Sequence, residues 1–378
     1  MRYGGYIVIV VLMTFVAARC EEAARSNTAH ASETTAEAPE TGTASYDSAG
    51  QVAPPADTLH GEVFFSGEAL GDPTRLMVQG SYLLVGDQSL RPPIHVLDAE
   101  TGRYLGSAGR KGQGPGEFSN VWAFVRGAAN GAEVGVYDGA LRRLTRVDLR
   151  PLAQGKPPVP GAVVPAQLSF TLVSVDRVND SLLVATGFMP EGRLALLRPD
   201  LRLLRYVGPD PPGDADVPIP VRQHAYQRWV RYHPAWDVVL VAYFYADLVE
   251  AYRLDGTRVW AARGPQGFDP IYDVLPYQGQ PARATRPDTR YGYIALDKLG
   301  EDRVLGLFVG REDRDPEHFL AHEARLFDAE GRMTARFPLS PPAYTGLAGG
   351  SDGCFFTIVQ LPEPAVMRYC VPDDAGRR

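Results

Sequence analysis

A short strand pattern that ends in aspartate recurs along most of the chain. Each copy has an apolar stretch followed by Asp, then a turn and another apolar stretch. The intervals between successive aspartates are 50, 52, 55, 73 and 45 residues. Internal repeats of about 40 to 50 residues are typical of β-propeller blades, each built from four strands. The repeated aspartates are Asp98, Asp148, Asp200, Asp255, Asp328 and Asp373.

Six copies of the pattern predict an all-β, six-bladed β-propeller over residues 57–373, with a short tail at 374–378. The apolar runs are short and bounded by Gly, Pro, Asp or Asn, and no helical period persists over three turns. The long fourth interval predicts an insertion around residues 264–288. Because the last aspartate lies almost at the C-terminus, the sixth blade lacks an outer strand. We expect residues 59–65 to supply that strand and to close the ring.

Residues 1–20 are typical of a targeting segment. An apolar run at residues 6–16 is too short for a comfortable membrane span and fits the apolar region of a signal segment. Cys20 follows this run as in the lipobox of bacterial lipoproteins, but Arg19 stands where such sites have a small residue. Lipidation of Cys20 and ordinary cleavage after Ala18 therefore both stay open. Either route predicts export to the periplasm or cell envelope, with membrane contact only through the leader or a lipid.

Residues 21–56 are rich in Ala, Thr, Glu, Ser and Pro and have almost no large apolar side chains. Such a segment buries too little surface to offset the entropy of ordering it. We expect a disordered tether that holds the folded part away from a membrane.

The charge of the chain bears on its partners, and its cysteines bear on a disulfide. The net charge is −7, and the sequence has no basic stripe of the kind that binds nucleic acid, so we expect no nucleic-acid partner. Cys354 and Cys370 are close enough in sequence to share one hairpin. A disulfide in an oxidising compartment and two buried thiols both remain open.

The first two blades match each other best. In the first blade, an apolar stretch at residues 84–87 is followed by another at 94–98. In the second blade, residues 136–138 are followed in the same way by 144–148. Arg91 and Arg143 stand at about the start of these third strands. This resembles the NHL repeat, in which a second strand ends in Asp and an Arg precedes the third strand. Together with the turn at 98–102 and the Gly-rich link at 109–118, the chain looks like the TolB-like six-bladed propeller lipoproteins of bacterial envelopes. The resemblance covers about residues 59–373, and it implies a fold and a compartment but no shared reaction.

Aromatic and arginine residues gather in the segment 223–236. Trp, Tyr and Arg are the residue types enriched at binding hot spots, although strand alternation places half of such residues in a core. We expect one alternating set to pack between blades and the other to reach solvent or the channel. The ligand-binding candidates are Arg228, Trp229, Arg231, Tyr232 and Trp236.

Two aspartates, Asp87 and Asp138, stand at matching strand ends of the first two blades. Clustered carboxylates at a propeller channel suit Ca²⁺, whereas Asp at such a position also caps the following turn. No other cofactor is expected. His318 and His322 have the spacing of a helical metal site, but the surrounding sequence predicts a solvated loop.

Two functions follow from these features. The first is an exported, non-catalytic propeller that binds a protein, peptide or glycan. The second is a metal-dependent hydrolase or lyase, similar to a lactonase, with its site in the central channel. Three or more convergent ligand side chains favour the enzyme, and scattered single ones favour the binding protein.

Overall fold

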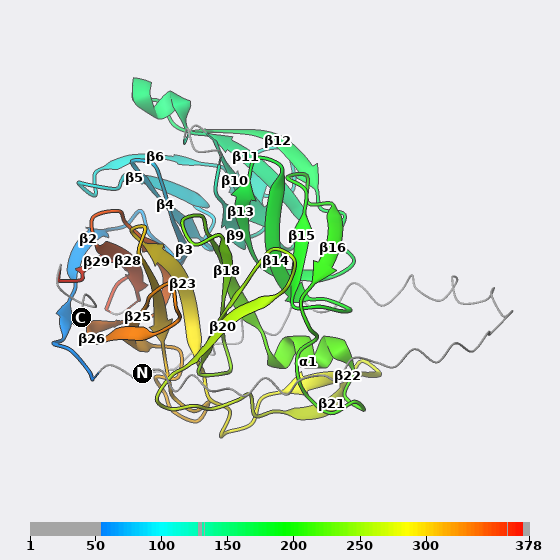
Figure 1. The fold of residues 1–378 in the computed structure, drawn as a ribbon. Helices are drawn as coiled ribbons and strands as arrows, with labels where there is room; N and C mark the ends of the chain where they lie inside the picture. The colour runs from blue at the N-terminus through cyan, green and yellow to red at the C-terminus, as the bar shows by residue number, and fades with distance from the viewer. Residues whose placement is uncertain (1–53, 128–130, 132, 361, 373–378) are drawn as a thin grey trace, which may run out of the picture. The chain divides into compact units, whose positions relative to one another are not determined.

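The computed structural model describes residues 54–127, 131, 133–360 and 362–372. The chain divides into two units, Met1–Tyr46 and Asp47–Arg378. The predicted leader with Cys20, and most of the predicted tether, lie outside the described residues. Within the described part of the second unit, six sheets of four or five strands form a ring (Figure 1), which confirms the six-bladed propeller. No helix among the described residues is long and apolar enough to cross a membrane.

Blades 1 to 3 each have four antiparallel strands, arranged in chain order from the channel outward. Their short apolar runs become strands because alternate side chains face the neighbouring blades on both sides. The strands are β3 (Pro73–Gln79), β4 (Tyr82–Asp87), β5 (Ile94–Asp98) and β6 (Tyr104–Ala108); β9 (Ala123–Val125), β10 (Glu133–Asp138), β11 (Arg143–Asp148) and β12 (Val159–Pro165); and β13 (Thr171–Asn179), β14 (Leu182–Phe188), β15 (Leu194–Leu197) and β16 (Leu203–Val207).

Blades 4 to 6 follow the same order, but blades 5 and 6 each include a strand from the N-terminal part of the described chain. The strands are β17 (Arg228–His233), β18 (Val238–Tyr243), β19 (Leu248–Tyr252) and β20 (Arg258–Arg263); β23 (Tyr293–Leu299), β24 (Arg303–Phe308), β25 (Ala321–Phe327), β26 (Met333–Ala343) and β1 (Leu59–His60); and β27 (Thr345–Gly349), β28 (Cys354–Val359), β29 (Ala365–Cys370) and β2 (Glu62–Ser66).

Ring closure by the N-terminal segment is confirmed. Strand β2 pairs antiparallel with β29, with Glu62 opposite Arg368 and Ser66 opposite Ala365, and Figure 1 shows the two side by side. The first two residues of the predicted strand take a different partner, because β1 runs parallel to β26 of blade 5. The closing segment therefore ties two blades together rather than one.

The repeated aspartates lie at or just after the end of the third strand of each blade. Asp98 accepts hydrogen bonds from the amides of Glu100 and Thr101, at 3.1 and 2.9 Å. The same bond from the residue two positions on recurs at Asp148, Asp200, Asp255 and Asp328. An Asp side chain that caps its own turn in this way fixes the bend between third and fourth strands, which explains the repeat. Asp373 lies outside the described residues.

Successive strands of a blade are antiparallel, so the loops between second and third strands lie on the same side as the connections between blades. We call this side the connection face. Most of the added structure is on it, including a hairpin within the predicted insertion. The added elements there are β7 (Arg110–Lys111), β8 (Glu117–Phe118), α1 (Ile219–Ala225), β21 (Asp273–Tyr277) and β22 (Gln280–Ala284); a 3-10 helix, η1 (Arg150–Gln154), precedes β12.

The two C-terminal cysteines form a disulfide, which resolves the alternatives that the sequence left open. Cys354 and Cys370 stand directly opposite each other on β28 and β29 of blade 6. The bond therefore links the two middle strands of the blade that closes the ring.

Candidate binding face and central channel

The six innermost strands surround a cavity of about 70 Å³ in the centre of the ring. Every blade contributes to its lining, because the first strand of each blade faces the axis. The lining combines apolar side chains and three hydroxyl side chains with a small set of charged and indole side chains. These are Arg75, Trp122, Arg126, Trp229 and Arg231.

One arginine crosses this channel. Arg126 of blade 2 donates two hydrogen bonds to Asp297 of blade 5, at 2.7 and 2.9 Å, and one to Asp176 of blade 3, at 2.9 Å. Burial would raise the pKa of Asp297, but the Arg126 and Arg231 guanidinium groups more than offset this and hold it below its usual range. Asp176 also accepts a hydrogen bond from the Tyr232 amide, at 3.0 Å. The network spans the channel and ties four blades together.

Two further arginines lie closer to the connection face. Arg75 is the third residue of β3, and Arg231 is the fourth of β17. Asp297 is the fifth residue of β23, and Arg126 follows the end of β9. Arg75 donates to the carbonyl oxygens of Trp122 and Thr74, at 2.7 and 2.9 Å. Because first strands start at the connection face, these groups lie between that face and the Arg126 network.

Aromatic side chains continue from the channel onto the connection face. Trp229 donates its indole N–H to the Tyr293 carbonyl, at 2.8 Å, and meets Phe244 edge-on at 6.2 Å. Tyr245 and Tyr291 are buried below, while Trp229, Phe244, His318 and Phe319 stay partly exposed. We call these six residues the aromatic group: Trp229, Phe244, Tyr245, Tyr291, His318 and Phe319.

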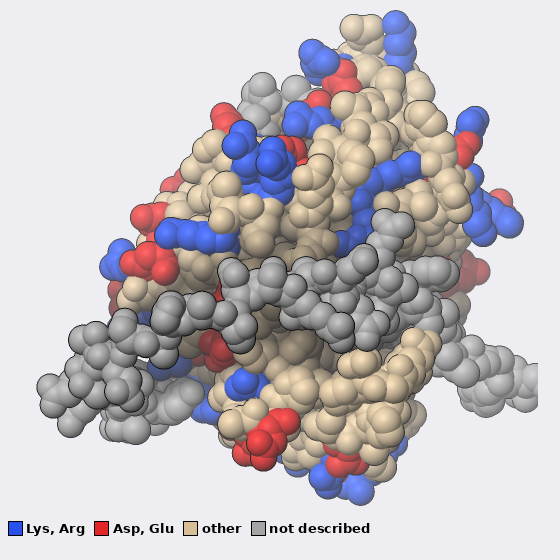
Figure 2. Space-filling view, turned by 90° about the vertical axis from the view of Figure 1, so that its right-hand side faces the viewer, with Lys and Arg blue, Asp and Glu red and all other residues tan. Residues whose placement is uncertain are grey.

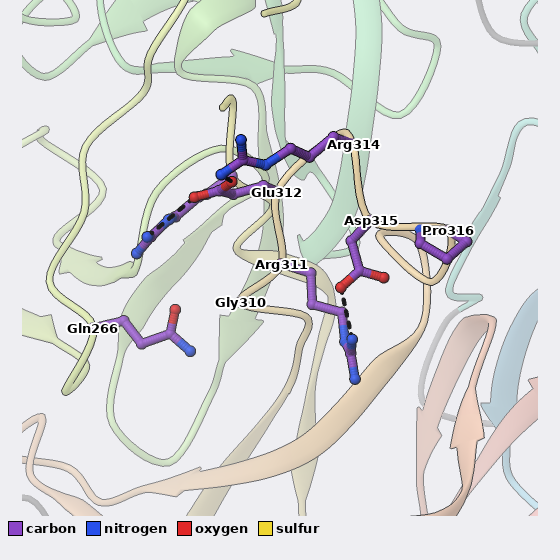
Figure 3. A pocket seen from close by; sticks show the side chains of 8 residues that line it. Gln266, Gly310, Arg311, Glu312, Arg314, Asp315 and Pro316 are labelled. Atoms are coloured by element: carbon purple, nitrogen blue, oxygen red, sulfur yellow. Dashed lines mark hydrogen bonds and ion pairs between the residues drawn. The ribbon is translucent and has the colours of Figure 1, made fainter. Parts of the chain in front are cut away.

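An open cleft of about 470 Å³ lies next to the aromatic group and is drawn in Figure 3. The cleft and the aromatic group are connected through the backbone, because the Tyr291 amide donates a hydrogen bond to the Arg311 carbonyl, at 2.9 Å. Arg290 and Arg314 both pair with Glu312, and Arg311 pairs with Asp315 at 2.7 Å. We call this pocket the arginine cleft; it is lined by Gln266, Arg290, Gly310, Arg311, Glu312, Arg314, Asp315 and Pro316.

The residues that the sequence singled out for ligand binding do not stay together. Trp229 and Arg231 reach the channel. Arg228 is buried between blades, where it donates to the Arg193 carbonyl and the Gln223 side chain, and burial lowers its pKa to about 10. The Arg228 guanidinium therefore makes its hydrogen bonds with groups inside the protein.

Tyr232 and Trp236 lie near the turn between β17 and β18, on the side opposite the connection face. The Tyr232 hydroxyl donates to Asp237 at 2.7 Å, and Trp236 stacks on His233 with ring centres 3.9 Å apart. The strand alternation that separates Trp229 from Tyr232 was expected, but the sequence did not show that Trp236 would fall on the other face.

Asp87 and Asp138, the metal candidates, each hold a turn. Asp87 accepts hydrogen bonds from the amides of Gly71 and Asp72, at 2.7 and 3.0 Å. Burial would raise the pKa of Asp87, but the His95 ring 3.6 Å away, Ser89 and these amides keep it well below its usual range. Asp138 accepts from the amides of Ser119, Asn120 and Leu141 in the same manner. Across the described residues, no group of three or more His, Cys, Asp or Glu side chains is placed to hold a metal ion.

The charged residues of the channel could not be recognised as a group from the sequence. Arg75, Arg126, Asp176 and Asp297 come from four different blades, so no spacing in the sequence links them. One signal was present: Arg75 is the one charged residue of its first strand, and Asp176 and Asp297 each stand beside a basic residue inside mainly apolar first strands. Charged residues are rarely buried unless they are paired, and such positions point to partners elsewhere in the fold.

No protein-family model and no curated protein matches the sequence. Among solved structures, a Bacteroides fragilis protein provisionally described as exported matches with a TM-score of 0.50 and 9% identity, over 82% of this chain and 94% of that one. A DUF4221 family member from Bacteroides vulgatus matches with a TM-score of 0.48 and 9% identity, over 82% and 97% of the two chains. The β-propeller domain of a Myceliophteria thermophila protein has a TM-score of 0.45 and 10% identity, over 82% and 100%. At these identities the likeness concerns the fold alone.

Proposed function

We propose that this chain is an exported, envelope-anchored, non-catalytic β-propeller that binds a protein, peptide or glycan ligand on its connection face. The observation that carries the proposal is the continuity of the aromatic group with the arginine cleft. Partly exposed aromatic rings sit on two buried tyrosines, beside a cleft with arginines on its wall. Rigid aromatic anchors and arginines are the residues that contribute most to binding energy. A cleft of this volume is also within the usual range of ligand sites.

The alternative is a metal-dependent hydrolase or lyase with its site in the channel, and Ca²⁺ is the cation that its carboxylates would suit. The arrangement of those carboxylates favours the binding function. Asp176 and Asp297 are both paired with Arg126, and Asp87 and Asp138 are surrounded by backbone amides. A carboxylate already neutralised by a guanidinium is a poor cation ligand, since binding would first break a buried pair.

The proposed location rests on the leader. Residues 1–20 carry the targeting pattern with Cys20 at its end, and the TolB-like resemblance points to the same compartment. One solved structure of similar fold is provisionally described as exported, which agrees with this location. Expression of the full chain in a bacterium followed by membrane fractionation tests it. With a lipid anchor, Cys20→Ser moves the protein from the membrane to the soluble periplasmic fraction; unchanged fractionation argues against the anchor.

Nucleic acid is outside the proposed ligand class. The chain carries 45 acidic against 38 basic residues. On the side drawn in Figure 2, basic and acidic side chains are interspersed rather than gathered into a stripe. Nucleic-acid affinity depends on such a basic stripe because phosphate contacts supply most of it.

The binding proposal is tested with arrays of peptides and glycans probed with the purified protein. One ligand class should be retained, and Phe319→Ala and Arg314→Ala should each weaken its binding at least tenfold. Arg332→Ala is the matched control, since Arg332 is also exposed and paired with carboxylates but lies at a turn on the opposite side. Equal effects of Arg314→Ala and Arg332→Ala would contradict the assignment of the face. Turnover of the ligand that depends on added Ca²⁺ would favour the enzyme.

A further inference from the structure

Arg75 and Arg231 line the central channel from two blades that stand opposite each other. In a ring of six, blade 1 stands opposite blade 4, and both arginines line the same cavity of about 70 Å³. Burial lowers the pKa of Arg75 to about 10, and the charge of Arg231 acts in the same direction. Two like charges in a confined, poorly solvated space repel strongly. The fold therefore keeps an unfavourable pair of cations at its centre.

The carboxylates of the channel neutralise this pair only in part. Asp297 lies 3.4 Å from the Arg231 Nε, but it is already bound by two hydrogen bonds to Arg126. Among the described residues, no carboxylate forms an ion pair with Arg75, whose guanidinium donates to backbone carbonyls. The Nε of Arg231 is buried and makes no hydrogen bond there. Counting Asp176, three guanidinium groups and the nearby Lys298 ammonium face two carboxylates, so positive charge is in excess.

We propose that Arg75 and Arg231 form a binding site for one small oxyanion, of the size of acetate or phosphate, between the Arg126 network and the connection face. An anion placed between the two guanidinium groups replaces their repulsion with two favourable charge-assisted hydrogen-bond pairs. The planar guanidinium fork suits carboxylate and phosphate oxygens better than an ammonium does. The site goes beyond the ligand proposed for the connection face, because it does not use the arginine cleft.

The size of the cavity limits what enters. A water molecule needs about 10–15 Å³ of such volume, so the cavity takes roughly five non-hydrogen atoms. Acetate and inorganic phosphate fit this limit, whereas a sugar ring does not. The Arg126 network blocks entry from the far side, so the anion enters past Trp122 and Trp229 from the connection face.

The test is calorimetric titration of the purified protein with sodium acetate and with inorganic phosphate, in a zwitterionic buffer low in chloride. We expect one anion per chain and a melting temperature that rises with anion concentration. Arg75→Gln and Arg231→Gln should each weaken binding at least tenfold, and the double variant should abolish it. Arg314→Gln in the arginine cleft is the control and should leave anion affinity unchanged.

The titrations distinguish an anion held by these two arginines from one held in the arginine cleft. Unchanged anion affinity in both Arg75→Gln and Arg231→Gln, or an equal loss in Arg314→Gln, overturns the proposal. Should Arg75→Gln fail to fold, Arg231→Gln carries the test, because Arg231 donates to the carbonyl of the adjacent Val230, and its ion-pair partner Asp297 keeps two hydrogen bonds from Arg126. If hexanoate binds as tightly as acetate, the anion of this site is the end of a longer ligand. If hexanoate binds more weakly than acetate, the anion is a free ion. If Arg75→Gln and Arg231→Gln lose acetate binding but still bind the ligand found on the arrays, the anion site and the connection-face site are independent.

Discussion

Arg126 of blade 2 donates both hydrogen bonds of one guanidinium nitrogen to Asp297, on the blade directly across the ring. The two side chains are 19% and 2% exposed, so this is a nearly buried ion pair that spans the channel. Blades of a propeller otherwise contact only their two neighbours. A bond across the axis couples blades that the ring itself leaves apart.

Substituting this arginine should destabilise the fold strongly. Arg126→Met leaves Asp176 and Asp297 buried with one partner fewer, and removing one member of a buried pair costs about 3–5 kcal/mol. Urea unfolding measures the change. Arg146→Met is the control, because Arg146 and its partner Glu133 are 43% and 48% exposed, and an exposed pair contributes about 0–1 kcal/mol. A similar loss of unfolding free energy in the two variants would show that the cross-channel pair contributes no more to stability than an exposed pair.

Gly61 marks the point where the closing segment passes from blade 5 to blade 6. A methyl group added at this position would stand 2.5 Å from the Tyr369 ring, which is itself buried. Gly61→Ala should therefore cost about 1–3 kcal/mol of folding free energy, as other cases of overpacking do. Gly161→Ala is the matched control, since the nearest atom there is 3.7 Å away. Thermal unfolding compares the two, and a control as unstable as Gly61→Ala contradicts a steric cause.

The disulfide of blade 6 should contribute measurably to stability. Cys354 and Cys370 are 16 residues apart, and closing a loop of that length stabilises a fold by about 3 kcal/mol in the chain-entropy model. We expect the double substitution Cys354→Ser with Cys370→Ser to lower the free energy of unfolding by about that amount. A reductant should lower the stability of the wild type toward that of the variant and leave the variant unchanged. A variant that still responds to reductant would point to another redox-sensitive group.

Stability should fall in mildly acidic solution because of His233. Its ring is fully buried, neither ring nitrogen has a hydrogen-bond partner in the described part of the chain, and burial lowers its pKa from 6.5 to about 4. The unfolded chain therefore binds a proton below pH 6.5 that the folded protein refuses until about pH 4. Folding free energy is lost across that window, by at most about 1.4 kcal/mol per pH unit for this group.

Urea unfolding between pH 7 and pH 5 checks this slope. His233→Phe keeps a ring against Trp236 and removes the titrating group, so it should flatten the slope. His224, whose pKa burial also lowers to about 4, should keep the remainder of the slope in that variant. Substitution of the exposed His60 by Gln is the control and should leave the slope as it is. No difference between His233→Phe and the wild type would assign the slope to other groups.

The blade count, the insertion and the closing strand could all be predicted from the sequence. Each depends on local information: the capping Asp at every turn, the lengths between turns, and an unassigned apolar stretch near the N-terminal end. An Asx turn forms from residues two apart, so it leaves the same mark in the sequence wherever it occurs. The proximity of Cys354 and Cys370 followed in the same way from a single hairpin.

Only the tertiary structure decided which charged residues meet in the channel. Arg126 and Asp297 are 171 positions apart, and the strands between them set their depth along the axis. Their pairing depends on the length and register of first strands in separate blades, which short-range patterns do not specify. The same holds for Trp229 and Trp236: seven positions apart in one segment, they lie on opposite sides of the ring because a strand and a tight turn come between them. Spacing along the chain determined the architecture, and the closure of six blades around one axis determined the site.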